Sequence, residues 1–166
     1  MSSKKRHVMY LNIEKSETPS LPDVKLITTA DGRNLGHLMY EAYQGTVDYE
    51  GETLDESIQE IEGTLVGKYG DLIEQASLMA VDSGKIVSAV IFVSYKKEGM
   101  PLLAFTMTHP DYRGRGLSQK LIKLAANNLA NIGHAKCCLV VTDGNQPAQS
   151  IYEKLGFTYK QVSESR

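Results

Sequence analysis

A glycine-rich segment between a strand-like stretch and an amphipathic stretch is the feature that most restricts how this chain can fold. The segment runs from His109 to Ser118 and reads HPDYRGRGLS. An apolar stretch from Leu102 to Thr108 precedes it, and a stretch with apolar residues at helical spacing follows it. Gly114 and Gly116 let the backbone reach positive φ and approach a ligand closely. The pattern predicts a strand, a tight turn and a helix whose first N–H groups can bind an anion such as phosphate.

Two well-known phosphate-binding motifs do not fit this segment. A Walker-type loop ends in Gly-Lys-Ser/Thr, whereas Gly116 is followed here by Leu117 and Ser118. A dinucleotide-binding fingerprint needs a third glycine, and that position is Gln119. It also needs an acidic residue at the end of a second strand about 20 residues further on, where this chain has its predicted helix instead.

The segment does resemble the pyrophosphate loop of the GNAT acyltransferase superfamily. Arg113, Gly116 and Ser118 form the pattern Arg-x-x-Gly-x-small, although the family usually has Gly or Ala where this chain has Ser118. A second motif downstream is similar to the other half of the family's signature and consists of Asn145, Ala148, Tyr152, Gly156 and Phe157. The resemblance covers the chain best from about residue 77 to 158.

The resemblance implies an α/β fold of the α+β three-layer type, in which a GNAT-like mixed central sheet is flanked by helices and contains a splayed pair of parallel strands. We expect this N-acetyltransferase domain over residues 24–166, after an N-terminal tail with an extra strand and a linker over residues 1–23. Only nine residues follow Phe157, which suffices for the family's sixth strand but not for its seventh. Our hypothesis is that the extra strand, Val8 to Ile13, fills that place within the chain or from a partner subunit.

Local signals elsewhere predict the other helices and strands. Apolar residues at helical spacing predict helices over 33–43, 54–69 and 117–132. After Ser77 the period changes from 3.6 to 2, which predicts antiparallel strands over 78–81, 86–95 and 101–108, in a sheet covered on both faces. A strand is also predicted over 24–27. A further strand over 135–142 should lie parallel to 101–108, because such crossovers are right-handed.

Composition and charge argue against several classes of protein. The net charge of −2 gives no basic excess of the kind that nucleic-acid binding requires. The N-terminus lacks the apolar run of a signal peptide, and no stretch approaches the ~20 apolar residues of a membrane helix. Cys137 and Cys138 are adjacent on a predicted strand, so they point to opposite faces and a disulfide between them would be strained. His37 and His134 lie apart from any ligand-like cluster. We expect a cytoplasmic protein with free thiols and no metal, nucleic-acid or membrane partner.

The resemblance also implies acetyl-CoA as a cosubstrate. Backbone groups of the strand before the loop would meet the pantetheine arm and the thioester carbonyl, and the loop would hold the diphosphate. Asn145 would bind pantetheine or order a water, or it is simply the cap of a helix that starts near Pro147. The expected cofactor-binding residues are Thr106, Met107, Thr108, Arg113, Gly114, Arg115, Gly116, Leu117, Ser118, Asn145 and Tyr152. For Arg113 and Arg115 an exposed surface role is the alternative, and we interpret His109 as structural.

The activity that the resemblance implies is transfer of an acetyl group from acetyl-CoA to a primary amine, by direct attack in a ternary complex. Tyr152 would be the catalytic general acid, because a phenol stays protonated at neutral pH and can protonate the departing thiolate. The alternative for Tyr152 is a ring that only packs against the sheet. A non-catalytic CoA-binding or regulatory module with the same fold is the rival function, and a nucleotide-binding protein is a third.

The sequence identifies neither the general base nor the acceptor. Family members often carry a glutamate on the strand before the loop, yet residues 102–108 contain no acid. The candidates are a water chain or one of the carboxylates Glu41, Asp48, Glu50, Glu52 and Asp143. In this fold the segment from Gln44 to Thr53 would overhang the acceptor pocket, where a small-molecule or peptide amine would bind; the alternative is a solvated connector. Homodimers are frequent in proteins that resemble this one, which leaves the oligomeric state open.

Overall fold

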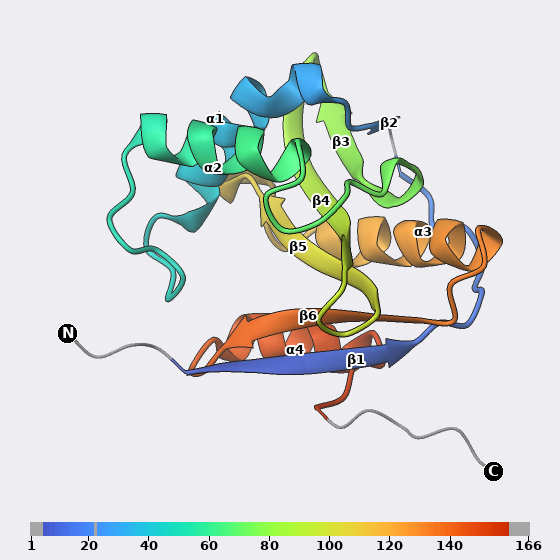
Figure 1. The fold of residues 1–166 in the computed structure, drawn as a ribbon. Helices are drawn as coiled ribbons and strands as arrows, with labels where there is room; N and C mark the ends of the chain where they lie inside the picture. The colour runs from blue at the N-terminus through green and yellow to red at the C-terminus, as the bar shows by residue number, and fades with distance from the viewer. Residues whose placement is uncertain (1–4, 22, 160–166) are drawn as a thin grey trace, which may run out of the picture.

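The computed structural model describes residues 5–21 and 23–159, and these form one six-stranded sheet with helices on both faces (Figure 1). The strand order is β1-β6-β5-β4-β3-β2. The strands are β1 (Arg6–Asn12), β2 (Val24–Leu26), β3 (Leu78–Asp82), β4 (Lys85–Tyr95), β5 (Met100–Thr108) and β6 (Lys136–Thr142). The α-helices are α1 (Gly32–Tyr43), α2 (Leu54–Leu65), α3 (Leu117–Asn131) and α4 (Gln146–Lys154). The expected mixed sheet with flanking helices is confirmed.

Each face of the sheet has its own hydrophobic core. On one face α3 and α4 pack against the sheet, with Leu121 of α3 buried against Phe92 of β4 and other core residues. On the other face α1 and α2 bury Leu35 and Ile61 against strand residues that include Ile91. Successive residues of a strand point to opposite faces, so a strand covered on both sides must be apolar throughout. This explains why β4 is an almost uninterrupted apolar run.

The parallel strands β5 and β6 pair over only a short length. Their register contains two residue pairs, Leu102 with Cys138 and Leu103 with Leu139. Beyond these pairs β5 continues to Thr108 along β4, and β6 continues to Thr142 along β1. Figure 1 shows the β6–β1 pair leaving the plane of the other strands. The predicted splayed pair is therefore present, and its open edges lie at the carboxyl ends of the two strands.

The N-terminal strand β1 belongs to the same sheet. It pairs antiparallel with β6 along its whole length, from Arg6 opposite Thr142 to Asn12 opposite Lys136. On its other side Tyr10 exchanges two backbone hydrogen bonds with Thr158, at 2.7 and 2.8 Å. The extra strand thus lies beside the C-terminal part of the chain within a single subunit, as our hypothesis requires. Most of the expected sixth strand of the family, residues 160–166, lies outside the described residues.

Helix α2 is shorter than the apolar periodicity predicts, because it ends at Leu65 instead of near residue 69. Gly67 has a φ of +107° and Gly70 a φ of +143°, and neither value is compatible with a helix. A Cβ atom at Gly70 would lie only 1.8 Å from the carbonyl oxygen of Ser94 on β4. The chain therefore passes directly over β4 at Gly70. The helix itself is closed earlier, at Gly67, where the backbone N–H groups of Gly67 and Lys68 bond the carbonyl oxygens of Thr64 and Gly63.

The two cysteines occupy the predicted opposite faces. Cys137 belongs to the core under α3 and α4, Cys138 belongs to the core under α1 and α2, and both side chains are fully buried as free thiols. Burial raises the pKa of each thiol to about 12, so both are protonated and unreactive at neutral pH. They are packing residues.

No helix among the described residues has the length and apolar character needed to cross a membrane.

Replacement of Gly70 by alanine tests the close approach to β4. We expect Gly70→Ala to lower the free energy of unfolding by about 3 kcal/mol, since the methyl group meets backbone and φ is unfavourable. Gly67→Ala is the matched control, because Gly67 also has positive φ but a Cβ there meets no atom within 4 Å; it should cost about 1 kcal/mol. Urea unfolding followed by circular dichroism measures both, and equal losses would contradict the steric explanation.

Candidate functional site

The glycine-rich loop leaves the N-terminus of α3 open. Gly116 is the N-cap residue of α3, with a φ of +72°, and no side chain caps the helix. Gly114 has a φ of +81°, and a Cβ at either glycine would meet no atom within 4 Å. The first N–H groups of a 15-residue helix therefore face open space at the positive end of its dipole. This is the geometry of an anion-binding site, and Leu117 and Ser118 are its first helical residues.

The two arginines of the loop have different surroundings. Arg113 donates a hydrogen bond from its guanidinium to the carbonyl oxygen of Ala42, at 2.6 Å, near the C-terminal end of α1. Arg115 is exposed, and its guanidinium lies over the ring of Tyr112, 4.5 Å from the ring centroid. Arg113 therefore joins the loop to the end of α1, where a positive charge is favourable. Arg115 stays beside the mouth of the loop.

The open edge of β5 carries an unsatisfied hydroxyl group. Thr106 lies three residues beyond the last pair with β6, and its Oγ1 atom is buried without a hydrogen-bond partner. Among the side chains of residues 5–21 and 23–159, no other buried polar atom lacks a partner. Neighbouring Met107 is buried, and the hydroxyl of Thr108 is 3.0 Å from that of Ser88. A buried hydroxyl without a partner is costly, so this position suits a ligand with hydrogen-bonding groups.

Asn145 stands at the junction of β6 and α4. Its Oδ1 atom accepts a hydrogen bond from the backbone N–H of Ala148 at 3.3 Å, so it is the N-cap of α4. Its Nδ2 atom donates to Oδ2 of Asp48 at 3.1 Å. The hydroxyl of Thr142, the last residue of β6, donates to Oδ1 of the same carboxylate at 2.6 Å. The capping role of Asn145 is thus observed, together with a contact to the loop between α1 and α2.

Tyr152 on α4 is 8% exposed, and its ring meets that of Phe157 edge-on with centroids 6.0 Å apart. Burial raises the pKa of Tyr152, and the negative charge of Asp48 raises it further. Burial also raises the pKa of Tyr43 at the end of α1, with smaller effects from Tyr152 and Asp48. Both phenols therefore keep their protons at neutral pH, and Asp48 lies close enough to act on both.

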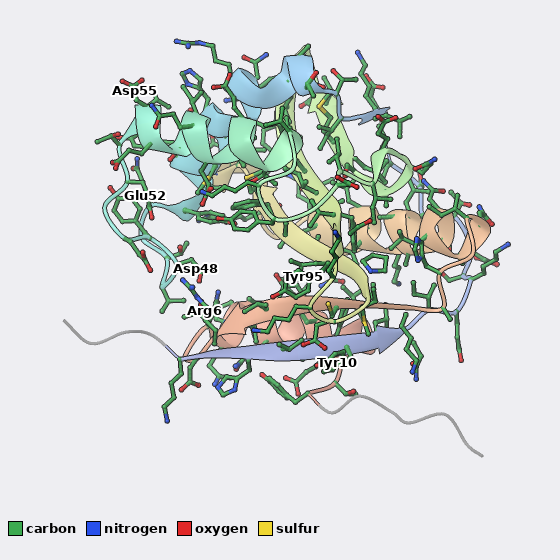
Figure 2. All side chains as sticks on the ribbon, viewed as in Figure 1. Arg6, Tyr10, Asp48, Glu52, Asp55 and Tyr95 are labelled. Carbon is green, nitrogen blue, oxygen red and sulfur yellow. The ribbon has the colours of Figure 1, made fainter. Side chains whose placement is uncertain are left out.

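The loop over residues 44–53 brings Asp48 to β6. In Figure 2 Asp48 and Arg6 lie where this loop comes nearest to the β1–β6 pair, while Glu52 lies further along the loop and Asp55 lies at the start of α2. Arg6 pairs with Glu50, at 3.6 Å, which ties the loop to β1 as well. The loop is therefore held against two strands by contacts that span more than 40 positions of the sequence.

The five candidate carboxylates have different partners. Glu41 contacts Nε2 of His109, Glu50 contacts Arg6, and Asp143 is 3.8 Å from His7. Glu52 accepts a hydrogen bond from the backbone N–H of residue 50 at 3.2 Å. Asp48 differs from them, because its carboxylate contacts Asn145 of the second sequence motif.

His109 is buried at the start of the glycine-rich loop and is bonded at both ring nitrogens. Its Nδ1 accepts a hydrogen bond from the backbone N–H of Asp111 at 3.1 Å. Its Nε2 is 2.6 Å from a carboxylate oxygen of Glu41 and 3.1 Å from Nζ of Lys85. Since Nδ1 is an acceptor, Nε2 carries the hydrogen and donates it to Glu41, and the Lys85 ammonium, which has only donor hydrogens, lies beside Nε2 without a hydrogen bond to it. These contacts join the loop to α1 and β4 and agree with a structural role.

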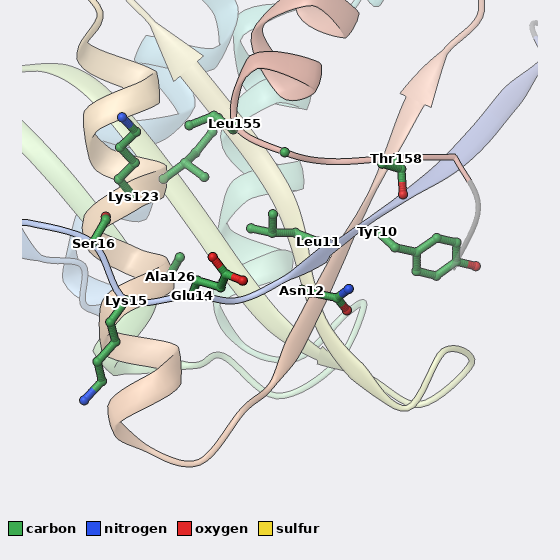
Figure 3. A pocket seen from close by; sticks show the side chains of 12 residues that line it. Tyr10, Leu11, Asn12, Glu14, Lys15, Ser16, Lys123, Ala126, Leu155 and Thr158 are labelled. Carbon is green, nitrogen blue, oxygen red and sulfur yellow. The ribbon is translucent and has the colours of Figure 1, made fainter. Parts of the chain in front are cut away.

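A cavity of ≈ 420 Å³ lies away from this region, between α3, the end of α4 and the segment that follows β1 (Figure 3). Its lining includes Leu11, Lys15, Lys123 and Leu155. None of the residues predicted for the site lines it. Within the described residues no group of three or more His, Cys, Asp or Glu side chains is placed to hold a metal ion.

With this geometry established, comparison with known proteins identifies the family. The family model described as the acetyltransferase (GNAT) domain matches residues 74–159, which is more than half of the chain. The chain therefore belongs to the GNAT acetyltransferase family. The matched region extends from the 3-10 turn Glu74–Ala76, just before β3, to the bridge at Thr158 and includes both sequence motifs.

Two relatives and one solved structure show how far the likeness extends. Mycothiol acetyltransferase of Corynebacterium glutamicum is 49% identical over 54 residues, which cover 32% of this chain and 18% of that protein. N-alpha-acetyltransferase 30 of Schizosaccharomyces pombe is 31% identical over 90 residues, which cover 52% of this chain and 60% of that protein. The chain thus spans less than two thirds of either relative. The PaiA N-acetyltransferase of Thermoplasma acidophilum, solved in complex with coenzyme A, has the same fold, with a TM-score of 0.65 at 17% identity over 85% of this chain and 92% of that one.

The structural role of His109 can be tested by its removal. We expect His109→Ala to lower the free energy of unfolding by about 2 kcal/mol, because Glu41 and the N–H of Asp111 lose a partner and a cavity forms. His37→Ala, at an exposed position of α1, is the control and should change stability by no more than about 0.5 kcal/mol. Chemical unfolding measures both. Equal stability of the two variants would remove His109 from the structural role.

Proposed function

We propose that this protein is an N-acetyltransferase that moves the acetyl group of acetyl-CoA to a primary amine by direct attack in a ternary complex. The observation that supports this proposal is that an open helix N-terminus follows one of the splayed strands, while the helix that follows the other carries a buried, protonated Tyr152 within electrostatic reach of Asp48. The first suits a phosphate group and the second suits proton donation. Membership of an acetyltransferase family supports the same activity. The two buried free thiols are in keeping with a cytoplasmic location.

The residues around the splayed strands fit coenzyme A. The N–H groups at the start of α3 would hold its diphosphate, with Gly114 and Gly116 allowing close approach and Arg115 adding charge. The hydroxyl of Thr106 and the unpaired backbone edge around Met107 and Thr108 would bond the amide-rich pantetheine arm. Arg113 would contribute indirectly, because its hydrogen bond to Ala42 holds the loop against α1. The bound cosubstrate supplies the acetyl thioester.

Tyr152 would serve as the general acid. Its raised pKa keeps the proton on the phenol at neutral pH, and a thiolate leaving group is a strong enough base to take that proton. Backbone N–H groups of β5 beyond the last pair with β6 would polarise the thioester carbonyl, as the amides of an oxyanion site do. Acceptors of the small-molecule and peptide kinds are both in keeping with the relatives named above.

Replacement of Tyr152 by phenylalanine tests the acid role. We expect Tyr152→Phe to lower kcat roughly 100-fold, because the thiolate loses its proton donor, while affinity for CoA changes by less than about twofold. Thiol release from acetyl-CoA over an amine panel and calorimetric titration with CoA give the two values. Tyr69→Phe, at an exposed tyrosine bonded to Glu60, is the control. Unchanged turnover would exclude Tyr152 as the acid.

Replacement of Gly116 by valine tests the diphosphate site. Valine at a φ of +72° is strained and places a branched side chain at the mouth of α3, so we expect CoA affinity to fall at least about tenfold. Gly99→Val is the matched control, since Gly99 has a φ of +68° and equally open surroundings in the β4–β5 turn. Thermal shifts with CoA, ATP and NAD measure the effect.

Two results would overturn parts of this proposal. Undiminished CoA affinity in Gly116→Val, or a larger thermal shift with ATP or NAD than with CoA, would show that the loop is not a CoA site. Tight CoA binding without thiol release for any amine would instead identify a non-catalytic CoA-binding module.

A further inference from the structure

Asp48 is held at the junction of β6 and α4 by two hydrogen bonds from distant parts of the chain. Thr142 donates to one carboxylate oxygen at 2.6 Å and Asn145 donates to the other at 3.1 Å. The donors are the last residue of β6 and the N-cap of α4. The carboxylate is therefore anchored at the carboxyl end of one of the two splayed strands, although Asp48 belongs to the loop between α1 and α2.

No basic side chain of the described residues forms an ion pair with Asp48. Both of its observed partners are neutral donors, and none of the ion pairs formed within residues 5–21 and 23–159 includes it. The neighbouring acids Glu50 and Asp143 lie beside Arg6 and His7. Each carboxylate oxygen can accept two hydrogen bonds, so Asp48 keeps acceptor capacity for a further donor. Its side chain is only half-buried, which leaves it within reach of a ligand.

Two phenols lie within electrostatic reach of Asp48. Its charge acts on the buried phenol of Tyr152 on α4 and on that of Tyr43 at the end of α1. A half-buried carboxylate with neutral partners, beside two phenols, attracts a cation that can donate hydrogen bonds. A protonated primary amine is such a cation, and it is also the ordinary form of an alkyl amine at neutral pH.

We propose that Asp48 binds the acceptor as its ammonium ion and takes the proton that makes its nitrogen nucleophilic. This inference rests on the proposed acetyl transfer and adds to it the charged form in which the amine binds and the identity of the base. It selects Asp48 from the five carboxylates that the sequence left open. Glu41, Glu50 and Asp143 lie against His109, Arg6 and His7, and Glu52 is bonded to a backbone N–H of its own loop, whereas Asp48 is the one of the five that contacts Asn145.

The proton and bond changes of this step balance. The ammonium ion gives one proton to Asp48, and the freed lone pair of nitrogen forms the N–C bond to the acetyl carbon. The C–S bond breaks, and the sulfur takes the phenolic proton of Tyr152. The nitrogen then loses a second proton, which restores the Tyr152 phenol, and Asp48 releases its proton to water. The products are the acetylated amine, the free thiol of CoA and one proton.

Two substitutions separate this role from simple anchoring of the loop. Asp48→Asn keeps the shape and one acceptor oxygen but removes the charge, and Asp48→Glu keeps the charge. The probes are butylamine, 1,4-diaminobutane and the peptide Ala-Lys-Ala with acetyl-CoA, followed by thiol release. We expect Asp48→Asn to lower kcat/KM for the best of these amines roughly 100-fold, with CoA affinity from calorimetry within about twofold of wild type. Asp48→Glu should recover at least about a tenth of wild-type kcat/KM.

Glu50→Gln is the matched control, because Glu50 lies on the same loop but is paired with Arg6; its kcat/KM should stay within about threefold of wild type. Melting temperatures of all variants show whether they fold. Wild-type kcat/KM in Asp48→Asn, or equal losses in Asp48→Asn and Asp48→Glu, would overturn the role of the charge while acetyl transfer stands. Wild-type protein that binds CoA but acetylates none of the probes would refute the proposed function, and this inference with it.

Discussion

The early end of pairing between β5 and β6 is the constraint on which the rest of the site depends. Two parallel strands that paired along their whole length would satisfy each other's backbone groups and leave no edge for a ligand. Here they share two residue pairs and then separate, because β6 follows β1 while β5 follows β4. The unpaired edges and the orphan hydroxyl of Thr106 result from this separation, and the glycine-rich loop places the uncapped N-terminus of α3 directly after β5.

Strand β1 makes the separation stable. A strand that left its neighbour would expose an unpaired edge on both sides, which proteins avoid. Full pairing of β6 with β1 removes that exposure on one side, and the bridge from Tyr10 to Thr158 brings the C-terminal part of the chain to the far side of β1. An N-terminal segment thus supports the geometry at the opposite end of the chain, and its residues also reach the loop over 44–53, through Arg6.

Local patterns predicted much of the fold, and the misses have a physical cause. Periodicity located the helices and most strands within a few residues, because side-chain spacing reflects which face is buried. The predicted end of α2 was wrong because Gly67, with a positive φ, closes the helix through two backbone hydrogen bonds, and apolar periodicity alone does not record such a cap. At the candidate site, the glycine-rich loop and Asn145 were recognisable from their spacing. The proposed choice of Asp48 among five carboxylates could not be made from the sequence, since the partners of Asp48 lie 94 and 97 positions away.

The sequence by itself determined the local elements, the family and the motif residues, since each depends on residue type and spacing along a short stretch. Only the tertiary structure decided which strand lies beside β6, that Arg113 reaches Ala42, and that Asp48 stands next to Asn145 near Tyr152. These arrangements follow from packing and hydrogen bonding between segments far apart in the chain. No local pattern encodes such contacts, because they exist only once the sheet has assembled.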